Sequence, residues 1–255
     1  MGWQQDKIAQ KRENLLNDYK ELVKDIHLLR EQGKKEDGNL AIKCNWNDSD
    51  YKAVCSDKLY QFNKKHGGLW CKSLACKCRK YANIEVTLDD NPCYESVALK
   101  EWRFGAGWDH NIKTGVALRP RHIKNIRDGR LAILSSVLPH HTEESERFII
   151  ALIFINKICD DPGKETIFFG DPEKSIKIDY QKHKLRFWDY YENPRKPKEV
   201  IWASGLYRYI TNRCVLKMLR DIVNKQVLPK NDLEKAEILI DYLDRLEKDK
   251  TPSPE

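Results

Sequence analysis

The sequence predicts an α+β protein whose centre is a small, curved β barrel with flanking helices. Three observations predict this class. Short runs of β-branched and aromatic residues recur between residues 84 and 188, apolar residues return at helical spacing after residue 206, and a helical apolar seam precedes both. A chain of 255 residues with 40% hydrophobic content can bury a sizeable core, and we favour a small module joined to a mid-sized domain over one large domain.

The first predicted element is a helix from about Gln5 to Gln32, within an N-terminal segment that ends at residue 38. After the first step its apolar residues alternate at spacings of four and three, and Gly33 with the charged stretch behind it ends the helix. Such a seam either packs on the chain's own domain or pairs with a second copy, which would give a homodimer. The seam consists of Ile8, Leu15, Tyr19, Leu22, Ile26 and Leu29.

Residues 39–80 form a basic segment that has few aliphatic residues and five of the eight cysteines. A segment of this composition cannot close a core unaided, and a tetrahedral zinc site would supply the missing folding energy. The spacing Cys71-x4-Cys76-x-Cys78, with His66 five residues ahead, suits thiolate and imidazole ligands, and Cys55 or Cys93 can supply a fourth. We expect zinc on Cys55, Cys71, Cys76 and Cys78, and the equal alternative is free cysteines packed as small apolar residues.

Residues 81–204 hold the predicted barrel. The stretch from Ile84 to Leu88 alternates in period two, and the unbroken apolar run from Phe148 to Ile155 suits a strand covered on both faces. Together with shorter β-type runs these segments predict a strongly bent sheet or small barrel. The shorter runs cover residues 131–134, 166–169, 176–178 and 185–188.

Residues 205–250 change to helical spacing. Apolar residues from Leu206 to Val223 predict one helix, and Asn231 followed three residues later by Glu234 predicts the capped start of a second. Residues 251–255 hold two prolines and no apolar side chain that could anchor them, so we expect a disordered tail.

The net charge of +7 is concentrated in the middle third of the chain. Residues 58–80 hold seven basic and no acidic side chains, and residues 113–130 hold six basic and one acidic. A localised basic surface either binds a polyanion, with DNA favoured over RNA, or is a solvated face without a partner. The basic residues assigned to nucleic acid are Lys72, Lys77, Arg79, Lys80, Arg119, Arg121 and Lys124.

An aromatic, glycine-rich stretch from residue 102 to residue 110 is the second candidate site. Flat side chains beside glycine can form a platform on which an exposed base stacks, while a neighbouring Asp or His hydrogen-bonds its edge. A second aromatic group near residues 188 and 202 is expected to form the opposite wall, and the alternative is that these rings are core anchors. The predicted pocket consists of Trp102, Phe104, Trp108, Asp109, His110, Trp188 and Trp202.

A metal-dependent nuclease is the enzymatic alternative. The Asp109-His110-Asn111 sequence invites it, but a ββα nuclease needs further ligands on a following helix, and here the chain continues into Arg119-Pro120-Arg121. No catalytic residue is therefore assigned.

Three pieces in chain order carry a family resemblance: Cys93 to Ser96, Asp128 to Leu134, and Arg147 to Leu152. In strand order and turn placement they resemble the PUA-like superfamily, specifically EVE- and YTH-type domains, over about Tyr81 to Trp202. The resemblance implies a curved β barrel that takes one flipped, often modified base into an aromatic pocket. In several bacterial defence systems such readers are joined to a nuclease, whereas this chain has no recognisable nuclease half and carries a cysteine-rich insertion.

The sequence thus predicts a nucleic-acid-binding protein that reads a modified or flipped base, in bacterial defence or restriction. A third interpretation is a zinc-braced interaction protein that dimerises through its N-terminal helix. No apolar stretch has the length of a signal peptide core or a membrane span, so we expect a cytoplasmic protein without a membrane partner.

Overall fold

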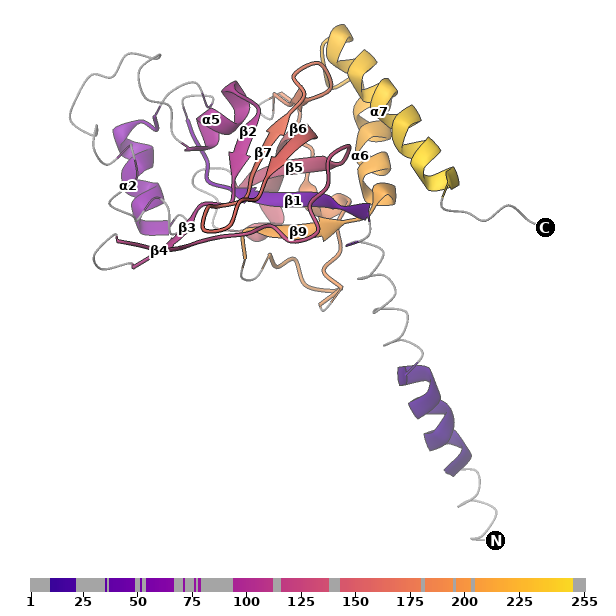
Figure 1. The fold of residues 1–255 in the computed structure, drawn as a ribbon. Helices are drawn as coiled ribbons and strands as arrows, with labels where there is room; N and C mark the ends of the chain where they lie inside the picture. Colours follow the sequence, from indigo (N-terminus) through magenta and orange to yellow (C-terminus); the bar gives the residue numbers. More distant parts are fainter. Residues whose placement is uncertain are drawn as a thin grey trace, which may run out of the picture.

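The computed structural model describes residues 10–21, 35, 37–48, 51, 54–66, 71, 76, 78, 94–111, 116–137, 143–179, 182–194, 196–202 and 205–249. They form a mixed α+β fold around one open sheet with helices on its faces (Figure 1). The α+β class is therefore confirmed. The predicted strand at 84–88 and the tail at 251–255 lie outside the described residues.

The main sheet has the strand order β2-β7-β6-β5-β1-β9, and β8 pairs with β6 beside this path. Strand β1 runs parallel to β5, and the other pairs are antiparallel. In the described part of the chain β2 and β9 end the order without pairing to each other, so the expected closed barrel is not found. The strands are β1 (Asn39–Cys44), β2 (Arg103–Gly105), β5 (Leu131–Val137), β6 (Arg147–Cys159), β7 (Ile167–Gly170), β8 (Ile176–Lys177) and β9 (Tyr207–Ile210).

Strand β1 is a central element that the sequence did not predict. It lies in the cysteine-rich segment, yet it pairs with both β5 and β9 and occupies a central place in the sheet. Leu40, Ala41 and Ile42 are fully buried. Three apolar residues are too few to establish a period, whereas the longer runs at 131–134 and 148–155 were predicted correctly because they are covered on both faces.

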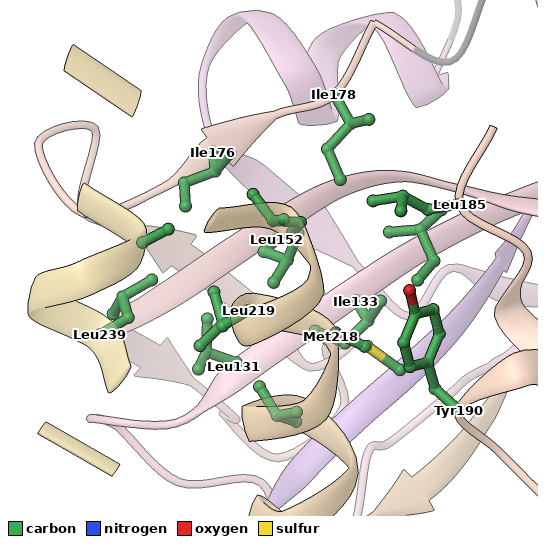
Figure 2. Packing of buried hydrophobic residues seen from close by; sticks show 14 of the residues in the cluster. Leu131, Ile133, Leu152, Ile176, Ile178, Leu185, Tyr190, Met218, Leu219 and Leu239 are labelled. Atoms are coloured by element: carbon green, nitrogen blue, oxygen red, sulfur yellow. The ribbon is translucent and has the colours of Figure 1, made fainter. Parts of the chain in front are cut away.

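The two faces of the sheet carry separate hydrophobic cores. On the helical face, Leu131 and Ile133 of β5 pack with α6 (Asn212–Asn224) and α7 (Lys230–Asp249), as Figure 2 shows. Ala132 and Leu134 point to the opposite side, because successive strand residues alternate between faces. We call that side the lobe face, since α2 (Asp57–His66) and α5 (Tyr94–Lys100) contribute to its core.

Two predicted elements near the C-terminal helices are wrong in detail. Leu206 and Ile210 belong to extended chain that enters and forms β9, and α6 begins only after Thr211, whose side chain accepts a hydrogen bond from the amide of Cys214. Helix α7 begins at Lys230, which places Asn231 within the first turn.

The predicted strand at residues 185–188 is also different. These residues form an isolated bridge at Arg186 and enter a short 3-10 helix, η2 (Phe187–Asp189), whose Phe187 is buried in the helical-face core.

Residues 10–21 are helical, in agreement with the predicted N-terminal helix. In Figure 1 this helix lies away from the sheet, and its apolar residues Leu15 and Tyr19 are 61% and 64% exposed. The seam therefore does not pack on the described part of the chain. Among the described residues, no helix combines the length and apolar character that crossing a membrane requires.

A buried polar network joins four elements at one end of the sheet. Asn39 of β1 donates to Asn212 of α6 over 2.6 Å and accepts from the backbone amide of Leu131 in β5 over 3.0 Å. Asn212 in turn donates to Glu247 of α7 over 2.7 Å, and its backbone amide donates to Asp37 over 2.8 Å. Both asparagines are fully buried, so each lost bond leaves an unsatisfied polar group inside the protein.

We predict that Asn212→Ala lowers the free energy of unfolding by about 2–4 kcal/mol, because it removes the acceptor of the buried Asn39 amide and the side-chain donor to Glu247. Urea unfolding monitored by circular dichroism measures the change. The matched control is Asn224→Ala at the exposed C-terminal end of the same helix, expected to stay within about 0.5 kcal/mol of wild type. Equal stabilities for the two variants would contradict the role of the network.

Candidate nucleic-acid interface

Strands β3 (Trp108–His110) and β4 (Ala117–Pro120) form a two-stranded antiparallel ribbon that is separate from the main sheet. Figure 1 shows the ribbon extending away from that sheet. Its base is held by backbone bonds, since Arg121 donates to Gly107 over 2.9 Å and Thr166 donates to Arg121 over 3.1 Å. Gly107 has φ of +77°, which glycine adopts without strain, and its amide also donates to the carboxylate of Glu165.

One face of the ribbon carries an acidic residue between two arginines. Asp109 lies opposite Arg119 in the strand register, and Arg121 follows two positions later on the same face. The carboxylate of Asp109 accepts from the Nε atoms of Arg119 and Arg121 over 2.7 and 2.6 Å. Each arginine makes this contact through its Nε atom. In the described part of the chain, no contact of the terminal guanidinium nitrogens with another side chain is found.

The ion pairs set the ionisation of Asp109. The hydrogen bonds from Arg119 and then Arg121 hold the pKa of the carboxyl below its ordinary value. The group of three therefore keeps one net positive charge at neutral pH. The side chain of Arg119 is 81% exposed and that of Arg121 is 36% exposed, so both guanidinium groups are open to solvent.

The ribbon also exposes apolar side chains. Trp108 is 36% exposed, and Val116 and Leu118 are 59% and 62% exposed. The register shifts between Asp109 and His110, which leaves Leu118 without a directly opposite residue. Arginines and exposed apolar groups therefore occur together on one small projecting element.

The turn that follows the ribbon is anchored from two sides. The hydroxyl of Tyr209 donates to the carbonyl of Lys124 over 2.6 Å, and the amide of Lys124 donates to the hydroxyl of Tyr207 over 3.4 Å. His122 pairs with Asp160 over 2.7 Å, and hydrogen bonds from Thr166 and then His122 lower the pKa of the Asp160 carboxyl. These contacts fix the backbone while the side chain of Lys124 stays exposed.

Two of the predicted pocket residues are buried in different cores. Phe104 is 2% exposed and stacks on Phe168 in the lobe-face core, with ring centroids 5.4 Å apart. Trp202 is 1% exposed in the helical-face core, where Arg147 and Arg208 lie 4.8 and 5.5 Å from its ring centroid. The sheet separates the two rings, so they do not form opposite walls of one pocket.

The other predicted tryptophans are partly buried or exposed. Trp102 packs against the lobe-face core, and Trp188 packs against the helical-face core while its indole nitrogen donates to the carbonyl of Glu144 over 2.6 Å. Of the described aromatic residues in the predicted pocket, Trp108 is the most exposed.

Part of the predicted site falls outside the described residues. This applies to Lys72, Lys77, Arg79 and Lys80, and to the side chain of His110, whose backbone belongs to β3. The sequence reasoning in turn missed Arg147, which is 1% exposed and forms an ion pair with Glu144. Its position at the start of an apolar run gave no signal of a buried charge.

The four cysteines of the predicted zinc site contact one another. The Cys71 thiol hydrogen-bonds with Cys76, and the Cys78 thiol hydrogen-bonds with Cys55 and with Cys76. These contacts, followed by burial, raise the pKa of Cys71 and of Cys78. Within the described ranges, however, no group of three or more His, Cys, Asp or Glu side chains is arranged around one point as metal ligands would be.

A buried carboxylate lies beside these cysteines. Glu95 of α5 accepts hydrogen bonds from the backbone amide and the side-chain amide of Asn45, over 3.1 and 2.9 Å, and burial raises its pKa. Asn45 follows β1 directly, so this contact ties α5 to the central sheet.

The fold and the site together define an α+β protein with an arginine-bearing ribbon and a buried cysteine cluster. No protein-family model, curated protein or solved structure matches the chain. What the chain does must therefore be inferred from its own residues.

We predict that replacing both Arg119 and Arg121 by Ala raises the pKa of Asp109 toward its ordinary value of 3.8. Because the folded pKa is lowered, the stabilisation from this carboxylate is present above the unfolded pKa and is lost as the pH falls through the folded pKa. Carbon-13 NMR of the Asp109 carboxyl measures the titration, and Arg220→Ala is the control because it pairs with Asp244 elsewhere. A wild-type carboxyl that titrates at or above 3.8 would contradict the assignment.

Proposed function

We propose that this chain binds nucleic acid, with DNA favoured over RNA, through the β3–β4 ribbon and the turn behind it. The observation that carries the proposal is the arrangement of Arg119 and Arg121, two exposed arginines that Asp109 holds side by side. Arginine recognises phosphate oxygens with paired N–H groups, and each of these guanidinium groups has terminal N–H groups besides the Nε–H that the carboxylate engages.

The charge of the surrounding residues supports a polyanionic partner. Residues 108–111 and 116–130 contain five basic side chains and two acidic ones, Asp109 and Asp128. Asp109 accepts hydrogen bonds from both arginines, so it holds the two guanidinium groups in place and cancels only one of their two positive charges. Lys124 and Arg127 in the anchored turn are exposed and extend the basic surface beyond the ribbon.

The shape of the ribbon supports contact with a groove or with unstacked bases. A two-stranded β ribbon is narrow enough to enter the major groove of DNA. Trp108 offers a ring on which a base can stack, and Leu118 offers an apolar contact to base edges. Base contacts by such residues would accompany phosphate contacts by the arginines.

We further propose that the nucleic acid is recognised through a modified or flipped base, by a PUA-like domain that acts in bacterial defence. Trp108 is its stacking residue, because Phe104 and Trp202 are buried on opposite sides of the sheet. A panel of methylated, hydroxymethylated and unmodified duplexes tests it, and equal affinity for all of them would remove the modified-base part alone. Plasmid incubated with magnesium or manganese in the same series tests the nuclease alternative.

We predict that binding to a labelled DNA duplex weakens as salt rises, and that replacing Arg119 and Arg121 by Ala reduces the slope of log K against log salt by about 2. Each arginine that neutralises a phosphate releases about one counterion. Fluorescence anisotropy between 50 and 200 mM salt, about the range over which such slopes are resolved, gives the slopes.

The control for this experiment is the double replacement of Arg220 and Arg245 by Ala on the two C-terminal helices. It removes the same charge and should leave the slope unchanged, because these residues lie on α6 and α7 and not on the ribbon. Equal slopes for both double variants, or no wild-type binding at low salt, would overturn the proposal. Trp108→Ala should instead weaken binding evenly across salt, by about 1–3 kcal/mol if one base stacks there.

A second candidate function, self-association, is favoured by the exposed N-terminal seam. Leu15, Leu16 and Tyr19 are more than half exposed on the described helix, and the alternating spacing of four and three is the repeat by which a helix pairs with its own copy. We therefore propose that the occupant of this seam is the same helix of a second chain.

We predict a wild-type mass of about twice the 30.0 kDa of one chain, and a single-chain mass after replacement of Leu15 and Tyr19 by Lys. Size-exclusion chromatography with light scattering measures both. The paired control replaces Lys11 and Lys20 by Gln on the same helix. A wild-type monomer at high micromolar concentration would refute the pairing.

A further inference from the structure

We propose that Cys55, Cys71, Cys76 and Cys78 bind one structural zinc ion that holds the cysteine-rich segment together. The proposal is independent of nucleic-acid binding, because none of these four residues belongs to the ribbon or to its anchoring contacts. It rests on the contacts among the four thiols, on their surroundings and on the small core of the segment.

The first observation is that the four sulfur atoms form one connected set. Cys76 and Cys78 pack with Cys55 in one cluster, and thiol hydrogen bonds link Cys71 to Cys76 and Cys78 to both Cys76 and Cys55. Cys71 also interacts with Cys55, which brings the two ends of the chain of contacts near each other. The other described cysteines are Cys44, Cys159 and Cys214, and they take no part in this set.

The spacing of touching thiols is close to that of zinc ligands. With a Zn–S distance of about 2.3 Å, a tetrahedral site places its sulfurs about 3.8 Å apart, which is the range in which two sulfur atoms touch. Among the described residues, no three such side chains already surround one point. Binding of one ion would therefore require the four thiols to turn toward a common centre.

A second observation concerns the amide of Asn63 in α2. Asn63 is 4% exposed, and its side-chain nitrogen lies 3.7 Å from the sulfur of Cys55 and 2.9 Å from the carbonyl of Trp46. An N–H group beside a ligand sulfur is the kind of supporting contact that metal sites commonly contain.

Around these cysteines the described residues form only a small separate cluster. Its buried members are Tyr60, Cys76 and Cys78, with Val54 and Cys55 packed against them. A zinc tetrathiolate at this place would contribute folding free energy directly. Three of the four cysteines are less than a tenth exposed, as a closed structural site requires.

Zinc is the metal that this ligand set favours. Four thiolates in tetrahedral arrangement select zinc over the hard cations magnesium and calcium, which prefer oxygen ligands. The site would carry two negative charges, and the basic residues Lys72, Lys77 and Arg79 alternate with its ligands in the sequence. The expected metal is therefore a soft divalent cation whose coordination positions are all filled by the four cysteines.

The experiment measures zinc in the purified full-length chain by plasma mass spectrometry after dialysis against a weak chelator. About one zinc ion per chain is expected, and Cys76→Ser should lower the occupancy at least tenfold. The matched controls Cys159→Ser and Cys214→Ser also remove one described cysteine each and should keep full occupancy.

Cobalt substitution of the wild-type chain keeps the test decisive where a cysteine variant fails to fold. Strong visible d–d bands with sulfur-to-cobalt charge transfer would support four thiolate ligands. Overturning results are a wild-type chain without bound zinc that gives no such cobalt spectrum, a disulfide among these cysteines in non-reducing peptide mapping, or full occupancy in the Cys76→Ser variant.

Discussion

The 2.6 Å hydrogen bond between Asn39 and Asn212 is the contact on which the arrangement of the whole fold depends. Asn39 begins the central strand β1 opposite Ile210, the last residue of β9, and Asn212 begins α6 two residues after Ile210, so the bond fixes where the N-terminal part of the chain enters the sheet. Neither amide can be left unpaired in a fully buried place without a cost of about 1–3 kcal/mol. The same strand ends at Cys44, and α2 follows it along the chain within the cysteine-rich segment.

The parts of the fold that sequence could predict are those with long, two-sided burial. The run that forms β6 is apolar over most of its 13 residues, and the helices after residue 211 repeat their apolar pattern over several turns. The hydrophobic pattern gave wrong predictions where an element is short or where a strand is followed directly by a helix. Leu206 and Ile210 happen to be spaced like helix residues, but they precede the Thr211 cap, and three consecutive apolar residues in β1 carry no period.

The candidate site depends on information that spacing does not contain. Asp109 meets Arg119 and Arg121 only because β3 and β4 pair in one particular register, with an irregularity after Asp109. A shift of one residue would turn the carboxylate and the arginines to opposite faces. Aromatic residues illustrate the same limit, since Phe104 and Trp202 look like equivalent platform residues in the sequence and become core residues on opposite faces of the sheet.

The ribbon and the cysteine cluster are held in place by different sets of hydrogen bonds, so they can fulfil different roles. The ribbon is held by backbone bonds of Gly107, Arg121 and Thr166, and the turn behind it is held by two tyrosines of β9. The cysteine cluster is held by α2 and by the segment around Trp46. Loss of the proposed zinc ion should consequently affect the residues around Cys55 more than the arginine pair, because the hydrogen bonds of the two supports share no residue. The two supports still meet in the lobe-face core, which contains Trp46 and Leu59 on one side and Ala106 and Ile123 on the other.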